Sequence, residues 1–93
     1  MKLRFTRRAL GDLQRLRAFV ARNNPPAAIR ISEGLRLSIR KLQDQPLIGQ
    51  VLRHPPGVRR WVSGPYVVHY VIDGDTLTVV RIWHGRERRP ELL

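Results

Sequence analysis

Two amphipathic helices are predicted in the first half of the chain, where apolar residues recur at helical spacing. Thr6 offers a side-chain oxygen for a helix N-cap, and one apolar stripe follows it: Ala9, Leu13, Leu16 and Val20. Residues 23–26 (Asn-Asn-Pro-Pro) predict a turn. A second stripe then runs to about Gln43: Ala28, Ile31, Leu35, Ile39 and Leu42. The two stripes predict a helical hairpin in which Leu37, off the stripe, has no core role.

The second half of the chain predicts strands, because Val, Ile, Tyr and Trp replace the helical periodicity. A passage rich in proline and glycine, from Pro46 to Gly57, separates the two halves. Three strands are expected over residues 58–63, 66–72 and 76–84, joined by turns containing Gly64 and Gly74. Residues 2–5 alternate and predict a further strand at an edge. The order β-α-α-β-β-β describes an α+β fold, a two-helix hairpin packed on an antiparallel sheet.

Composition narrows the class of partner. The 93 residues fit one domain spanning 1–93, and 18 Lys+Arg against 7 Asp+Glu give a net charge of +11. Sixteen of those cations are arginine, which binds phosphates and carboxylates in bidentate fashion, so an acidic protein or a nucleic acid is expected. Without cysteine, and with three isolated histidines, neither a metal site nor a cofactor is predicted. No apolar leader or membrane span is apparent, so we expect a cytoplasmic protein.

The order and spacing of these motifs resemble the RelE/ParE toxin superfamily over essentially the whole chain. The matching residues are Phe5-Thr6, Ala9, Asp12-Leu13, Asn24-Pro25, Ala28, Leu42, Pro46, Gly49, Val58-Arg59, Gly64 to Val68, Tyr70, Asp73 to Asp75, Val80 to Ile82, and His84 to Arg86. Family members are similar in fold and in having a cognate antitoxin. Their targets differ, because ParE-type toxins poison DNA gyrase whereas RelE-type toxins cleave mRNA on the ribosome.

The nuclease branch requires a base, an acid and cations around the phosphate. In RelE-like enzymes these roles fall to basic residues of the central strands, to an arginine after the last strand, and often to a tyrosine near the C-terminus. Here Arg86 matches the arginine, Leu92 stands in place of the tyrosine, and residues 61–63 (Trp-Val-Ser) replace expected cations beside Arg59 and Arg60. We therefore favour a ParE-like gyrase inhibitor without chemistry of its own. A RelE-like mRNA endoribonuclease remains the alternative, with three candidate catalytic residues: His84, Arg86 and Arg59.

Two sets of residues are predicted to meet partners. The basic tail would reach the target through Arg86, Arg88 and Arg89. The resemblance also implies a ParD-like antitoxin, small, acidic and partly disordered, forming a hetero-oligomer with this chain. Its expected contacts are exposed residues of the two helices: Leu10, Arg15, Arg22, Leu37 and Arg40. The competing interpretation of these cations, and of Arg36 and Lys41, is a solvated helix face.

The histidines have structural interpretations beside the catalytic one. His84 is favoured as a strand-end residue, His69 as a sheet residue among apolar neighbours, and His54 as a solvated loop residue. A plain nucleic-acid-binding module is a third functional class, suggested by charge alone. It ranks last, because the chain lacks a recognition helix, a glycine-rich phosphate loop and an RNA-binding aromatic pair.

Overall fold

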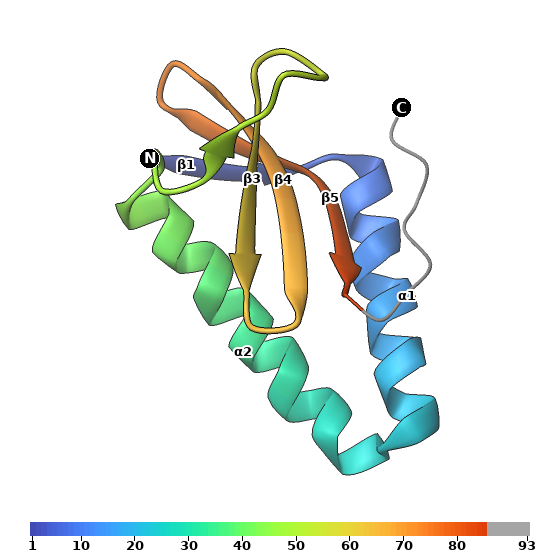
Figure 1. Ribbon diagram of the computed structural model, residues 1–93. Coiled ribbons are helices and arrows are strands. Elements are labelled where there is room, and N and C mark those ends of the chain that lie inside the picture. The colour runs from blue at the N-terminus through green and yellow to red at the C-terminus, as the bar shows by residue number, and fades with distance from the viewer. Residues whose placement is uncertain (86–93) are drawn as a thin grey trace.

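The computed structural model shows two helices packed against one face of a five-stranded sheet (Figure 1). It describes residues 1–85, apart from the side chains of residues 23, 25, 27–29 and 31–32. The elements in chain order are β1 (Lys2–Phe5), α1 (Arg7–Asn23), α2 (Pro25–Asp44), β2 (Gln50–Val51), β3 (Val58–Ser63), β4 (Tyr66–Asp73) and β5 (Thr76–His84). The strands lie in the order β1-β5-β4-β3-β2, so the predicted edge position of β1 is confirmed.

The predicted α+β fold is confirmed, with two refinements of the sheet. β1 runs parallel to β5, pairing Lys2 with Thr76 and Phe5 with Val79, so the sheet is mixed. Alternation along a strand is the same in either direction, and therefore the sequence pattern could not give the orientation of β1. β2 is an additional strand inside the passage expected to be a loop, antiparallel to β3. Two residues are too few to carry a periodicity.

The predicted start of α1 also fastens the helix to the sheet. Thr6 Oγ1 accepts a hydrogen bond from the Ala9 N–H at 3.1 Å, as an N-cap does, and donates one to the Val80 carbonyl at 3.2 Å. Val80 is the extra residue of a β-bulge, since His69 of β4 pairs with Arg81 and Tyr70 with Val79. One hydroxyl thus caps α1 and satisfies a carbonyl that the bulge leaves beside it.

The core lies between the helices and the sheet face that they cover. Its buried residues come from both helices and from β4 and β5: Ala9, Leu16, Leu35, Ile39, Leu42, Tyr66, Val68, Tyr70, Leu77, Val79 and Ile82. The predicted stripes are therefore confirmed at these helical positions, and Leu13 packs against the cluster while partly buried. Ala28 and Ile31 fall outside the described side chains. A hydrogen bond between the Ser38 and Ser63 hydroxyls, 2.8 Å long, joins α2 to β3.

The predicted hairpin turns are present, with Gly64 at φ 56° and Gly74 at φ 60°, a backbone region that favours glycine. No helix among residues 1–85 is long and apolar enough to cross a membrane.

Candidate functional site

An apolar groove opens between the two helices and the sheet, with a volume of about 280 Å³. β1 and β4 contribute its floor, and α1 and α2 contribute its walls. The lining residues are Leu3, Phe5, Leu13, Leu16, Arg17, Val20, Leu35, Arg36, Ile39 and Tyr66. Only Arg17 and Arg36 among them are charged. Such a surface can receive apolar side chains of a partner, because exposed apolar area of this kind is released from water on binding.

Leu10 and Leu37, predicted to contact an antitoxin, are 50% and 64% exposed. Leu10 precedes Leu13 by three residues and Arg17 by seven, so helical spacing places it on the same side of α1 as the groove. Leu37 follows Arg36 on α2, about 100° further round the helix, and is not part of the groove wall. Neither leucine lines the groove, and Leu10 lies beside it on the side of α1 that carries Arg17.

The predicted antitoxin-binding arginines do not line the groove. Arg15 and Arg22 are one heptad apart, on the side of α1 turned away from Arg17. Arg40 lies one turn after Arg36, near the C-terminal end of α2, where it borders a polar depression with Met1, Gln43 and Asp44. The sequence did not single out Arg17, whereas Arg36 had two interpretations, a solvated helix face and a contact to acidic side chains of an antitoxin. The available signal was the four-residue spacing of Arg17 from Leu13, which puts both on one strip.

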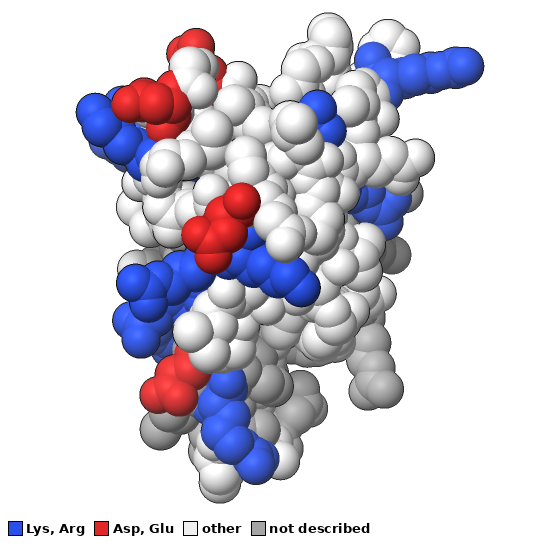
Figure 2. Space-filling model, turned by 90° about the vertical axis from the view of Figure 1, so that its left-hand side faces the viewer, with Lys and Arg blue, Asp and Glu red and all other residues white. Residues whose placement is uncertain are grey.

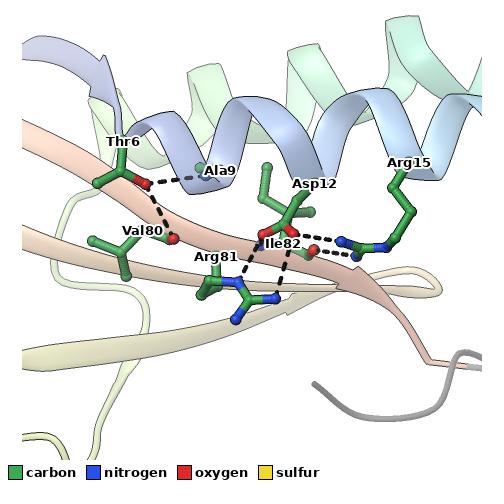
Figure 3. Close-up of polar contacts among 7 residues, drawn as sticks. All are labelled: Thr6, Ala9, Asp12, Arg15, Val80, Arg81 and Ile82. Carbon is green, nitrogen blue, oxygen red and sulfur yellow. Dashed lines mark hydrogen bonds and ion pairs between the residues drawn. The ribbon is translucent and has the colours of Figure 1, made fainter. Parts of the chain in front are cut away.

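A buried polar cluster joins the other side of α1 to β5 (Figure 3). The Asp12 carboxylate, in a residue 3% exposed, accepts hydrogen bonds from Arg81 Nε at 2.9 Å and from the Ile82 N–H at 2.9 Å. Arg15 also donates to Asp12 and, through Nη2, to the Ile82 carbonyl at 3.0 Å. We call these four residues the α1–β5 seam. They satisfy strand-edge groups of β5 beyond the end of β1, which pairs with β5 only as far as Val79.

The seam holds Asp12 in its ionised form at neutral pH. Burial acts to raise the pKa of this carboxyl, but the hydrogen bonds from Arg81, Ile82 and Arg15 outweigh it and bring the pKa below the ordinary value of 3.8. Arg81 is 8% exposed, so its charge is compensated within the protein and is not presented to a ligand.

Arg59, a candidate of the nuclease alternative, is also occupied. Its Nη1 donates to the Gly49 carbonyl at 2.8 Å, while the Tyr70 hydroxyl accepts from the Gly49 N–H at 2.8 Å and donates to the Pro46 carbonyl at 2.8 Å. Burial raises the pKa of Tyr70, opposed by the Gly49 N–H and by the Arg59 charge. Together the two side chains hold the loop before β2, a structural task that the sequence did not reveal.

Two of the three histidines, His69 and His84, pack against aromatic rings. The His69 residue is 3% exposed and its ring meets Trp83 edge-on, with 4.6 Å between ring centroids. The half-buried His84 ring contacts Tyr66 at 5.4 Å and Phe19 at 5.6 Å between centroids. His54 is exposed in the loop before β3. The predicted target-binding residues Arg86, Arg88 and Arg89 lie outside the described residues. No group of three histidines and carboxylates within residues 1–85 could hold a metal ion.

Comparison with known proteins identifies a family. Residues 3–89 match the family described as ParE toxin of type II toxin-antitoxin system, parDE. The chain is 33% identical over 87 residues to Toxin RelE1 of Caulobacter vibrioides, covering 88% of this chain and 90% of the relative.

Two solved structures share the fold. A chain of the chromosomal ParDE TA system from P. aeruginosa superposes with a TM-score of 0.79 at 22% identity, covering 90% of this chain and 95% of that one. A chain of the toxin–antitoxin complex RelBE2 from Mycobacterium tuberculosis gives a TM-score of 0.66 at 26% identity, covering 89% and 95%. The predicted RelE/ParE resemblance is therefore confirmed, and the chain belongs to the ParE toxin family of type II toxin–antitoxin systems.

Proposed function

We propose that this toxin inhibits DNA gyrase and is neutralised by a small, acidic, ParD-like antitoxin that docks in the groove between α1 and α2. The observation that carries the proposal is the groove itself, an apolar surface edged by arginines on a chain of net charge +11. Viewed from the side of α2, basic groups outnumber acidic ones (Figure 2). An acidic partner would compensate this charge and cover the apolar wall in one step.

The state of the cations supports a toxin without chemistry of its own. A nuclease needs cations free to stabilise a phosphorane. Arg81 is compensated by Asp12, Arg59 is bound to the Gly49 carbonyl, and His69 is buried against Trp83. Gyrase inhibition needs only a binding surface, because gyrase itself performs the DNA chemistry.

Ribosome-dependent mRNA cleavage remains the second candidate. The relative at 33% identity carries the RelE name. In addition, His84 lies half-buried at the end of β5, two residues before Arg86 in the sequence. The two candidates differ in what the purified chain does to a defined substrate.

The deciding experiment compares the purified chain in a gyrase supercoiling assay and in a ribosome-programmed mRNA cleavage assay. We expect the purified chain to abolish supercoiling by gyrase and to leave the mRNA intact. Adding the cognate antitoxin should restore the supercoiling activity of gyrase. Cleaved mRNA with unaffected supercoiling would contradict the gyrase proposal and favour the alternative. In the first assay, replacing Arg86, Arg88 and Arg89 with alanine should abolish inhibition without weakening the antitoxin complex. An unchanged inhibition would exclude the tail as the target contact.

A further inference from the structure

Two arginines line the groove from different helices. Arg17 of α1 lies in the strip formed by Leu13 and Val20, four residues before it and three after it. Arg36 of α2 follows Leu35 and precedes Ile39 in the opposite wall. Both residues are exposed. The groove therefore has an apolar floor with a cation on each side.

Neither charge is used inside the described part of the molecule. Arg17 and Arg36 form no ion pair or side-chain hydrogen bond there, although Glu33 lies only one turn before Arg36. Asp12, which could serve α1, is already engaged by Arg15 and Arg81 on the other side of the helix. Leucine at these two positions would extend the apolar walls. Arginine instead places positive potential along both rims.

We infer that Arg17 and Arg36 form a two-sided clamp that selects an amphipathic helix carrying carboxylates on both flanks of its apolar face. The inference rests on the proposed antitoxin docking and adds which chemistry the partner must have. A helix lying between two helices presents apolar residues to the floor at i, i+3, i+4 and i+7, and its flanking positions to the two walls. Arginine pairs with carboxylates in bidentate geometry, so each rim adds directional contacts.

Other occupants fit this groove less well. Apart from Arg17 and Arg36 the lining is apolar, whereas the phosphates of a nucleic acid are bound by many cations and polar groups along the backbone. A second copy of this chain would bring another +11 against the same rims.

The clamp is tested with three synthetic 20-residue helical peptides that share one leucine stripe. They carry glutamate on both flanks, glutamate on one flank, or glutamine on both. We expect the full-length chain to bind the first peptide about tenfold or more tightly than the third at low salt, with the second between them. Equal affinities for all three peptides would overturn the clamp.

Variants of the chain separate the clamp from general electrostatics. Arg17→Gln and Arg36→Gln should each weaken binding of the doubly acidic peptide by about five- to tenfold. Arg22→Gln removes the same charge from the far side of α1 and serves as the matched control, with a change below about twofold. The Arg17→Glu variant should bind a peptide with lysine on one flank more tightly than the wild-type chain does. Equal effects of the Arg17, Arg36 and Arg22 variants would refute a specific clamp.

The same variants distinguish this inference from the proposed function. Arg17→Gln/Arg36→Gln should still inhibit gyrase while requiring more cognate antitoxin for neutralisation. A wild-type chain that leaves gyrase unaffected, combined with weaker antitoxin binding by the double variant, would reject the target and keep the clamp. Gyrase inhibition by the wild-type chain, combined with unchanged antitoxin affinity in the double variant, would keep the proposed target and reject the clamp.

Discussion

Arg15 and Arg17 lie two residues apart on α1 but have different surroundings and different roles. Arg15 faces the seam, where it shares Asp12 with Arg81 and donates to the Ile82 carbonyl. Arg17 faces the groove among apolar residues and has no ion-pair partner within the described structure. The seam therefore uses its charges to hold α1 on β5, whereas the groove leaves them available. In this protein an arginine's role is decided by the side of the helix that carries it.

Replacing Asp12, the central carboxylate of the seam, should have the largest effect on the free energy of unfolding. Asp12→Ala leaves Arg81 buried without its counter-charge, so the free energy of unfolding should fall by about 3–5 kcal/mol. Chemical denaturation followed by circular dichroism measures the change. Asp44→Ala, at an exposed carboxylate near the end of α2, is the control and should stay within about 0.5 kcal/mol of wild type. Equal losses in the two variants would deny the seam its structural role.

Acid should weaken the seam in a defined window. The pKa of Asp12 is lower in the folded chain than its usual 3.8, so the stabilisation is fully present above that value. It is lost as pH falls through the lower folded pKa. The difference in unfolding free energy between wild type and Asp12→Asn should therefore be constant from pH 6 to about pH 5 and shrink below about pH 4. A difference that is independent of pH down to pH 2 would show that Asp12 does not titrate with folding.

The loop before β2, which Arg59 and Tyr70 hold, adds a third region to the comparison. A Cβ placed on Gly49 would lie 2.5 Å from the Tyr70 hydroxyl oxygen, so Gly49→Ala should destabilise the fold by about 1–3 kcal/mol. Gly34→Ala is the matched control, since the added Cβ meets no atom within 4 Å outside its chain neighbours and its own helix backbone. The free energy of unfolding should therefore rise by about 0.5–1 kcal/mol. Thermal denaturation of both variants checks the opposite signs. A tolerated alanine at position 49 would mean that Tyr70 does not fix this loop.

The smallest effects test the two arginines directly. Arg15→Gln should cost about 1 kcal/mol, because the seam loses charge-assisted hydrogen bonds at a side chain that is 41% exposed. Arg17→Gln should change the unfolding free energy by less than about 0.5 kcal/mol, since it breaks no internal contact. Denaturant titrations of the two variants under one buffer give the comparison. If Arg17→Gln destabilised the fold more than Arg15→Gln, Arg17 and not Arg15 would be the arginine that holds α1 in place.

Local chemistry made much of the fold predictable. The apolar stripes of α1 and α2, the Thr6 cap and the glycine turns each depend on residues close in sequence, and the structure has them where the pattern placed them. The family resemblance likewise followed from motif order along the chain. The direction of β1 and the two-residue strand β2 were not predictable, because each depends on pairing with another strand of the folded sheet.

The candidate site divided in the same way. The sequence by itself determined that the helices carry many arginines, that the chain is strongly basic and that Leu10 is off the core stripe. Only the tertiary structure decided which cations are compensated, since Asp12 meets Arg81 and Ile82 across about 70 residues of chain. Arg17 and Arg36 become a pair for the same reason. Charge is a property of composition, whereas its availability depends on which partners the fold brings within a few ångströms.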